Sequence, residues 1–484
     1  MERKAPFAAV RETHIGVVLL VGDRAYKLKK PVDLGFLDFS TRERRRAACR
    51  REVELNRRLA PDVYLGVAEL IDVDGSSSEP LVEMRRMPDD RRLSTLVRSA
   101  TPPADGVAAL ARLIAAFHST AERGPHIDAE GTRDALAGRW EDSFAQVESL
   151  SGSPLDPVAL GEIARLARAF LAGRDALFRS RVDEGRIVDG HGDLLADDIF
   201  LTDAGPRVLD CLEFDDRLRR LDGLDDIAFL AMDLERLGVP KLGELLLDRY
   251  REHTADPAPA SLRHHYIAYR AFVRVKVACL RHAQGDLAAA GDVVAYADIA
   301  RRHLRLGQVR LVLVGGLPGS GKTTVAGMLA DSLGAVLLSS DRVRKELAGV
   351  DPLAHVPAEY RQGIYDPEHT EHTYHELLRR AGELLARGES VVLDASWSHD
   401  RLRDRARLLA KQTHSGFFPL RCAVAERVAA QRIRSRTGSL SDADPAIAAA
   451  LAADTAPWPD AIGIDTSGQP ADAVAEALRA LGAA

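Results

Sequence analysis

Residues 310–327 read RLVLVGGLPGSGKTTVAG, and this stretch organises the rest of the chain. An apolar, β-branched run precedes a glycine-rich turn, and a helical pattern follows it. The turn fits G-x-x-x-x-G-K-[ST] at Gly316, Gly321, Lys322 and Thr323. A chance match rarely has a strand before it and a helix after it. The stretch therefore predicts a phosphate-binding loop (P-loop, residues 316–323) for a nucleoside triphosphate.

The residue types of the P-loop suit a bound phosphate. Glycines let the backbone wrap the anion without Cβ clashes. N–H groups of the turn and of the helix start face the anion together. Lysine adds a positive charge at the terminal phosphates, and a threonine hydroxyl can bind Mg²⁺. We assign nucleotide contacts to Gly316, Gly319, Ser320, Gly321, Lys322, Thr323 and Thr324.

Composition limits the classes of protein to consider. A length of 484 residues is enough for two or three domains. The net charge of −6 gives no general attraction to nucleic acid. The four cysteines form no C-x-x-C motif, which fits free thiols in a reducing cytoplasm. The N-terminus has no signal-peptide pattern, and no apolar run approaches the ~20 residues needed to span a membrane. We expect a cytoplasmic protein without membrane association.

Two aspartates follow strands predicted after the P-loop. Residues 335–341 and 389–395 read as parallel strands that lead to Asp341 and Asp394. Carboxyl ends of parallel strands face the ligand crevice, so both side chains are candidates for phosphoryl transfer. Arg432 and Arg436 lie one turn apart on a later predicted helix. They form either a phosphate clamp or an ordinary surface helix.

The beginning of the chain predicts a β-hairpin and a helix. The hairpin covers residues 15–32 and places Lys27 and Lys29 on one strand face. The helix, residues 41–59, is rich in arginine and contains Glu52. Interspersed glutamates favour a solvated face over a nucleic-acid patch for this helix.

A second stretch with chemical character is VDGHGDLLADDIFL, residues 188–201, followed by a strand leading to Asp210. Asp193 stands on a tight loop beside glycine, and Asp198 follows five residues later. Carboxylates on adjacent loops repel one another unless a cation or proton intervenes. Oxygen ligands of this kind favour Mg²⁺. Surface loops with ordinary acids are the alternative interpretation.

This second stretch resembles the catalytic core of aminoglycoside phosphotransferase-like kinases, whose usual pattern is H-G-D-x-x-x-x-N before a strand ending in aspartate. The resemblance covers about residues 10–300. It implies that Asp193 orients or deprotonates an acceptor hydroxyl and that Asp198 and Asp210 hold Mg²⁺. It also implies that Lys27 pairs with Glu52 as the lysine–glutamate pair of a kinase N-lobe.

Alternatives and departures accompany this resemblance. Lys29 is the alternative to Lys27, and Glu54 the alternative to Glu52. Asp198 stands where asparagine is usual, which keeps a metal ligand but adds a negative charge. No G-x-G-x-x-G loop precedes the first lysine strand; only THIG, residues 13–16, stands there.

The C-terminal part resembles small P-loop kinases of the gluconate-kinase, shikimate-kinase and zeta-toxin-like kind. SSDRVRKEL at residues 339–347 and VVLDAS at residues 391–396 carry this resemblance. It implies that Arg432 and Arg436 are lid arginines. Together the two modules resemble bacterial two-domain predicted kinases.

We therefore predict an α/β protein of two domains. Residues 1–305 would form a bilobal protein-kinase-like, aminoglycoside phosphotransferase fold, with an N-lobe over about 1–87 and a helical C-lobe over about 88–305. Residues 306–484 would form a P-loop domain with a parallel sheet.

The expected function is ATP- and Mg²⁺-dependent phosphoryl transfer to a hydroxyl of a small molecule such as a sugar, aminosugar or aminoglycoside. Catalysis would rest on Asp193, Asp341, Asp394 and Lys322. One alternative is a nucleotide-sensing regulator with one degenerate module. Another is a polynucleotide-end kinase, against which the acidic net charge argues. The sequence does not define the acceptor, the choice of ATP over GTP, whether both sites are active, or the oligomeric state.

Overall fold

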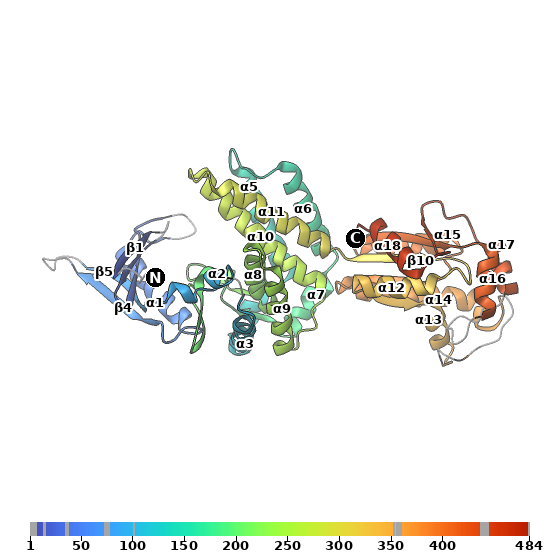
Figure 1. Ribbon diagram of the computed structural model, residues 1–484, viewed down its shortest axis with the longest axis horizontal. Coiled ribbons are helices and arrows are strands. Elements are labelled where there is room, and N and C mark those ends of the chain that lie inside the picture. The colour runs from blue at the N-terminus through green and yellow to red at the C-terminus, as the bar shows by residue number, and fades with distance from the viewer. Residues whose placement is uncertain are drawn as a thin grey trace. The chain divides into compact units, whose positions relative to one another are not determined.

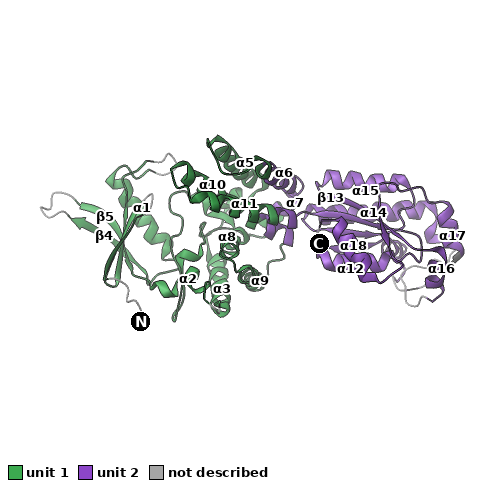
Figure 2. Cartoon of the chain, turned by 45° about the horizontal axis from the view of Figure 1, so that its top comes forward, with its two compact units in different colours: residues 1–160, 179–258, 266–302 green, residues 161–178, 259–265, 303–484 purple. Residues whose placement is uncertain are grey.

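The computed structural model describes residues 7–12, 16–33, 38–71, 78–99, 102–351, 354, 361–435 and 445–482. Contacts divide the chain into two units (Figure 2). The first unit holds residues 1–160, 179–258 and 266–302, and the second holds residues 161–178, 259–265 and 303–484. The second unit thus includes two short helical segments that precede the P-loop module in the sequence.

The N-lobe of the first unit is an antiparallel sheet in the order β1-β2-β3-β5-β4, with one helix packed on it (Figure 1). Helix α1, Arg42–Asn56, begins after Thr41, whose hydroxyl accepts a hydrogen bond from the Arg44 N–H. Buried Cys49 and Val82 connect the helix to the sheet. The strand bounds are β1 Ala8–Glu12, β2 Gly16–Val21, β3 Arg24–Lys29, β4 Tyr64–Ile71 and β5 Ser78–Arg85.

The C-lobe of the first unit is mainly helical, with α3, α8 and α9 packed together. Two small antiparallel sheets, β6 with β9 and β7 with β8, carry the loops that contain His191 and Asp210. The strand bounds are β6 Ile187–Asp189, β7 Ile199–Thr202, β8 Gly205–Val208 and β9 Arg220–Asp222. The helix bounds are α2 Leu93–Leu96, α3 Ala104–Thr120, α4 Pro125–Asp128, α5 Arg133–Ser149, α6 Pro157–Ala172, α7 Asp175–Asp183, α8 Gly223–Arg236, α9 Pro240–Thr254, α10 Ala260–Ala283 and α11 Ala289–Leu306.

Arg181 of α7 neutralises two carboxylates inside the first unit. Its guanidinium contacts both oxygens of Asp222 at 2.7 Å and the two oxygens of Asp256 at 2.5 and 2.7 Å. The three side chains are almost completely buried. The Tyr266 hydroxyl also donates to Asp222, at 3.1 Å. One cation therefore compensates two buried negative charges.

The second unit is built on a parallel sheet with β10, Arg310–Gly315, at its centre. The strand order is β11-β12-β10-β13-β14, and all pairings are parallel. The whole of β10 is buried, which explains its continuous apolar sequence. The P-loop leaves the carboxyl end of β10, at the edge where parallel strands present ligands. The other bounds are β11 Val336–Ser339, β12 Val391–Asp394, β13 Gly416–Ala423 and β14 Ile462–Asp465.

Helices cover this parallel sheet (Figure 1). Val312 and Val314 of β10 share a buried cluster with α12 and α18. Residues alternate across a strand, so Leu311 and Leu313 face the other side. Helices α14 and α15 pack together and contact the sheet through β12 and β13. The bounds are α12 Lys322–Leu333, α13 Ser340–Leu347, α14 Pro367–Ala386, α15 Asp400–Gln412, α16 Glu426–Ser435, α17 Pro445–Ala453 and α18 Pro470–Ala480.

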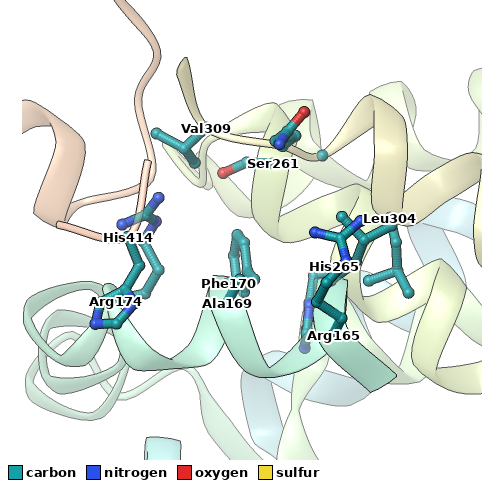
Figure 3. A pocket seen from close by; sticks show the side chains of 12 residues that line it. Arg165, Ala169, Phe170, Arg174, Ser261, His265, Leu304, Val309 and His414 are labelled. Carbon is teal, nitrogen blue, oxygen red and sulfur yellow. The ribbon is translucent and has the colours of Figure 1, made fainter. Parts of the chain in front are cut away.

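The two short helical segments of the second unit lie at the amino edge of its sheet. The Ser261 hydroxyl donates to the carbonyl oxygen of Gly388, just before β12, at 2.7 Å. The Arg174 guanidinium donates to the carbonyl oxygen of Thr413, just before β13, at 2.7 Å. These contacts join the start of α10 and the turn between α6 and α7 to the parallel sheet (Figure 3).

The predicted fold class is confirmed. An antiparallel lobe and a helical lobe precede a parallel sheet that contains the P-loop. One strand differs from expectation: β8 ends at Val208, and Asp210 lies two residues beyond it in the left-handed region, with φ of 62°. Within the described part of the chain, no helix is both long and apolar enough to cross a membrane.

Replacing Arg181 by methionine should destabilise the first unit strongly. The change leaves Asp222 and Asp256 buried without their cation, and breaking a buried ion pair costs about 3–5 kcal/mol. Urea unfolding followed by circular dichroism measures the loss. Arg249→Met is the matched control, because Arg249 pairs with Glu252 at the surface and such pairs contribute little. Equal stability of the two variants would contradict the role given to Arg181.

Candidate active sites

The P-loop depends on glycines with backbone angles that larger residues avoid. Gly316, Gly319 and Gly321 have φ of 145°, 79° and 82°. A Cβ atom on Gly319 would lie 2.5 Å from the carbonyl oxygen of Ala429, and one on Gly316 would lie 2.7 Å from that of Cys422. Both neighbours are backbone atoms, which cannot rotate away. Glycine is therefore required at these positions to keep the turn open for a phosphate.

Thr323 and Asp394 meet at the first turn of α12. The Thr323 hydroxyl donates to Oδ2 of Asp394 at 2.8 Å. Thr323 lies on the helix that follows β10, and Asp394 ends the neighbouring strand β12. The other carboxylate oxygen, Oδ1, is buried and has no hydrogen-bond partner among the described residues. The Ser320 hydroxyl oxygen is also buried without a hydrogen-bond partner among the described residues. Oxygens of this type fit a hydrated Mg²⁺ held by a hydroxyl and a carboxylate.

Asp341 and Lys322 both affect the pKa of Asp394. Burial raises the pKa of Asp394 above its usual value, Lys322 and the Thr323 hydrogen bond oppose this rise, and Asp341 adds to it. Asp341 lies in the first turn of α13, directly after β11. The three predicted catalytic residues of this module thus gather at the carboxyl edge of the sheet.

Arg432 of α16 lies beside the P-loop. Its guanidinium donates to the carbonyl oxygen of Thr466 at 2.7 Å, and the Thr466 hydroxyl donates to the carbonyl oxygen of Ser320 at 2.6 Å. A Cβ atom on Gly321 would approach the Arg432 guanidinium to 3.4 Å. The second predicted lid arginine, Arg436, lies outside the described residues.

Sequence reasoning missed the aromatic support behind Asp394. The Tyr374 hydroxyl lies 3.1 Å from the Ser396 hydroxyl and accepts a hydrogen bond from the Trp397 N–H at 3.2 Å. Trp397 is completely buried and has φ of 53°. A tryptophan three residues after a predicted strand end was the only signal. Arg344, three residues after Asp341 on α13, donates to the carbonyl oxygen of Ile364 at 2.8 Å.

Gly319→Ala should abolish nucleotide binding at the P-loop. The added Cβ collides with the backbone of α16, and the positive φ is strained for alanine. Photolabelling of the full chain with azido-ATP, followed by mapping of labelled peptides, should show loss of label from the second unit. Gly327→Ala is the matched control, because a Cβ on this glycine of α12 meets nothing within 4 Å. Retained labelling in Gly319→Ala would contradict the assignment.

A second candidate site lies in the first unit, where Lys27 of β3 lies between two carboxylates. Its ammonium is 2.9 Å from Glu52 of α1 and 2.5 Å from Asp210. Burial alone would lower the pKa of Lys27, but Asp210 and Glu52 raise it well above its usual value. Glu52 is fully buried, whereas Glu54 is exposed and pairs with Arg51. The geometry favours Glu52 over Glu54 as the partner of the lysine.

Lys29 forms a second ion pair with the same glutamate. Its ammonium lies 2.8 Å from Glu52 and 2.6 Å from Glu213, and its side chain is buried. Glu52 thus joins two lysines on one face of β3. Only Lys27 also reaches Asp210, so it is the lysine nearest to the predicted metal ligands. Glu213, which fixes the segment after Asp210, was not singled out from the sequence.

Asp226 holds the loop that contains Asp193. Its carboxylate accepts hydrogen bonds from the N–H groups of His191 at 2.7 Å and Gly192 at 2.9 Å. It also lies 3.0 Å from Nε2 of His118. Burial alone would raise the pKa of Asp226, but these partners lower it. Asp226 therefore has a structural role: it fixes the backbone on which Asp193 stands.

Asp193, Asp198 and Asp210 lie close enough together for their carboxylates to repel one another. Burial, followed by Asp210 and Asp193, raises the pKa of Asp198 well above its usual value. Burial raises the pKa of Asp193 to about 6, with Arg274 opposing the rise. Burial would also raise the pKa of Asp210, but Lys27 lowers it. A divalent cation between Asp198 and Asp210 would relieve this repulsion.

Each of the two predicted Mg²⁺ sites has only two protein side chains as ligands. No group of three or more histidine, cysteine, aspartate or glutamate side chains among the described residues is arranged to hold a metal. Mg²⁺ in phosphotransferases needs only one or two carboxylates, because substrate phosphates and water supply the other ligands. Both candidate sites, Asp198 with Asp210 and Thr323 with Asp394, fit this pattern.

The end of α1 is tied to the catalytic loops. The Arg58 guanidinium donates to the carbonyl oxygens of Asp189 and Gly190 at 3.1 and 2.9 Å and to the Asp189 carboxylate at 2.8 Å. The Asn56 side chain accepts a hydrogen bond from the Cys211 N–H at 2.9 Å. These contacts could not be predicted from the sequence, because the partners lie more than 130 positions apart.

Glu52→Gln should both destabilise the first unit and weaken its nucleotide site. The change leaves Lys27 and Lys29 without their shared carboxylate, and loss of one partner of a buried ion pair costs about 3 kcal/mol. Urea unfolding and azido-ATP labelling of the first unit measure the two effects. Glu54→Gln, two positions away and exposed, should match the wild-type chain in both. A Glu52 variant that behaves like the Glu54 variant would contradict this assignment.

Comparison with known proteins places the chain in a family. A model of the AAA domain family matches residues 311–456. Uncharacterized protein Rv2004c of Mycobacterium tuberculosis (strain ATCC 25618 / H37Rv) is 47% identical over 463 residues, which are 96% of this chain and 93% of that protein. Uncharacterized protein Mb2027c of Mycobacterium bovis matches to the same extent. The chain belongs to the family of these mycobacterial proteins.

Solved structures resemble each module separately. A choline/ethanolamine kinase family protein from Mesorhizobium loti is 15% identical, with a TM-score of 0.40, over 63% of this chain and 92% of that chain. A sugar kinase from Janibacter sp. HTCC2649 is 23% identical, with a TM-score of 0.29, over 36% of this chain and 96% of that chain. At these identities and TM-scores, neither resemblance says what this chain acts on. The chain combines an antiparallel lobe and a helical lobe with a parallel-sheet P-loop domain that matches the AAA domain family.

Proposed function

We propose that the protein is a bifunctional, ATP- and Mg²⁺-dependent phosphotransferase whose two modules each transfer a γ-phosphate to a hydroxyl group of a small molecule. The observation that carries the proposal is the contact of Thr323 with Asp394 directly under the P-loop. It supports a site in which a phosphate cradle, a hydroxyl and a carboxylate meet.

In the second unit, we assign a different role to each residue of the candidate site. The P-loop N–H groups and Lys322 bind the phosphates, and Thr323 and Asp394 would hold Mg²⁺. When bound, Mg²⁺ would neutralise part of the negative charge on the phosphates. Asp341, at the same edge of the sheet, is the group we assign to orienting the acceptor hydroxyl. Arg432 beside the turn is suited to contact the phosphates.

In the first unit, Lys27 would contact the nucleotide phosphates while Glu52 holds the lysine in place. Asp198 and Asp210 would bind Mg²⁺, and Asp193 would orient the acceptor hydroxyl and accept its proton. The hydrogen bonds that the His191 and Gly192 N–H groups donate to Asp226 support this role, because they fix the Asp193 loop before any substrate arrives. The proposed lysine, metal ligands and acceptor-orienting carboxylate are thus all present, which favours a working site over a degenerate one; the glycine-rich loop of similar kinases is missing from the sequence before β3.

A small polar acceptor, such as a sugar, aminosugar or aminoglycoside, is the substrate class we propose. The acidic net charge of −6 supports it over a polynucleotide end. All four cysteines are buried and free, which fits a cytoplasmic location.

A screen of sugars, aminosugars and aminoglycosides for stimulated ADP release should identify acceptors. With labelled ATP, Lys322→Ala should lose transfer to one acceptor, Asp193→Asn should lose transfer to another, and the double variant should lose both. We expect losses of at least about 100-fold in kcat, as for removal of groups that act in the transition state. If Asp193→Asn matches the wild-type chain on every acceptor while Lys322→Ala is inactive, the first unit is a regulatory module.

A further inference from the structure

Helix α8 contacts the loop between β6 and β7 at two points. Asp226, near the start of the helix, holds the beginning of the loop, just before Asp193. Seven residues further along α8, one carboxylate oxygen of Asp233 accepts a hydrogen bond from the Ala196 N–H group at 2.8 Å. Ala196 stands between Asp193 and Asp198 in the sequence. The second contact therefore holds the part of the loop that leads to the proposed metal ligand Asp198.

Asp233 caps the short turn that carries Asp198. Residues Ala196–Asp198 form a 3-10 helix, and the preceding residue, Leu195, has no side-chain oxygen that could cap it. N–H groups at the start of a helix lack a partner within the helix, so an acceptor must come from elsewhere. Asp233 supplies this acceptor from α8. The Asp198 N–H group then closes the turn by donating to the Leu195 carbonyl oxygen at 3.1 Å.

The backbone of Asp198 is joined in turn to the segment that leads to Asp210. The Leu209 N–H group donates to the Asp198 carbonyl oxygen at 2.9 Å. Beside this hydrogen bond, Ile199 of β7 pairs with Val208 of β8. Both proposed metal ligands therefore stand on backbone whose position depends on the turn that Asp233 caps.

Helix α8 is suited to set the spacing between the two ends of this loop. Residues seven positions apart on an α-helix lie on the same face, about 10 Å apart along the axis. The helix is buried along nearly its whole length and packs against α9. Phosphoryl transfer depends on such spacing, because the acceptor-orienting group and the metal must both be aligned with the phosphate.

Asp233 also lies in the field of a cation. Burial raises the pKa of Asp233, and the Ala196 hydrogen bond and the charge of Arg274 oppose the rise. Arg274 belongs to α10, one turn after Arg270, which donates to the carbonyl oxygen of Gly192 at 3.3 Å. Asp233 thus has two interactions to distinguish by experiment: a hydrogen bond to the loop and an electrostatic attraction to Arg274.

We propose that Asp233 is a positioning residue of the first unit, whose hydrogen bond with Ala196 holds Asp198 where it can bind Mg²⁺ beside the nucleotide phosphates. The inference rests on the function proposed above, in which Asp198 and Asp210 hold that ion. Asp233 acts through the loop backbone and is not itself a ligand. Hydrogen-bonded partners of this kind orient metal ligands in many proteins.

Hydrogen–deuterium exchange of the full-length protein, without nucleotide or metal, tests the structural step. Asp233→Leu removes the acceptor, so the Ala196 amide should exchange about tenfold faster, the size expected for loss of one hydrogen bond. Asp233→Asn keeps an oxygen that can accept this bond, and its Ala196 amide should exchange at the wild-type rate. Asp233→Ala, which adds no bulk, replaces Asp233→Leu in both measurements if the leucine variant does not fold.

Photolabelling with azido-ATP at increasing Mn²⁺ concentration tests the functional step. The Mn²⁺ concentration for half-maximal labelling of first-unit peptides should rise about tenfold or more in Asp233→Leu, as for loss of other groups that orient metal ligands. Asp233→Asn should keep the wild-type requirement. Glu235→Leu is the matched control, because Glu235 is a partly buried carboxylate of the same helix that pairs with Arg302. A general loss of stability would leave the Mn²⁺ requirement of both leucine variants unchanged.

Three results would overturn the proposal: unchanged exchange of Ala196 in Asp233→Leu, faster exchange with an unchanged Mn²⁺ requirement, or an Asp233→Asn variant that behaves like Asp233→Leu. The last result would mean that the charge matters and the hydrogen bond does not. Asp198→Ala separates this inference from the proposed function. If Asp198→Ala raises the Mn²⁺ requirement and Asp233→Leu does not, the inference alone is wrong. If Asp198→Ala leaves the requirement unchanged, the proposed metal site is wrong and the inference falls with it.

Discussion

Fully buried charges must meet opposite charges or hydrogen-bond donors, and this constraint fixes the catalytic region of the first unit. Glu52 meets two lysines, and Asp226 meets two backbone N–H groups and a histidine. The lysine pairs of Glu52 join β3 to α1. The contacts of Asp226 join α8 to α3 and to the loop after β6. The positions of Lys27 and Asp193 therefore follow from compensation of charge as much as from apolar packing.

The second unit is built differently, because its candidate site consists mainly of backbone groups of a glycine-rich turn. The P-loop needs close approach, and the Gly319 backbone lies against α16 so tightly that a single methyl group does not fit. Asp394 and Thr323 then place oxygen atoms next to that turn. The two candidate sites are thus built by separate means: paired side chains in one, and a bare backbone turn in the other.

The local parts of this arrangement could be predicted from the sequence, and the long-range parts could not. The P-loop, the end of β12 at Asp394, the position of Asp341 just after β11, and the shared face of Lys27 and Lys29 follow from short patterns in the sequence. Glu213 and Arg58 escaped notice because their partners are remote in sequence and the residues themselves look like ordinary surface charges. Asp210 was expected at a strand end, but its left-handed backbone depends on tertiary contacts, including the hydrogen bond from its N–H to the Tyr64 hydroxyl. The roles assigned to the site residues remain predictions.

The anchoring of α1 has a consequence for how the two lobes of the first unit can move. Arg58 and Asn56 attach the end of this helix to the backbone at Asp189, Gly190 and Cys211. The opposite end of the helix has no such attachment to the helical lobe in the described residues. The ion pairs of Lys27 with Asp210 and of Lys29 with Glu213 tie β3 to the same lobe, so any separation of the two lobes would have to break these ion pairs as well. A rotation of α1 by itself, independent of the helical lobe, would first have to break these hydrogen bonds.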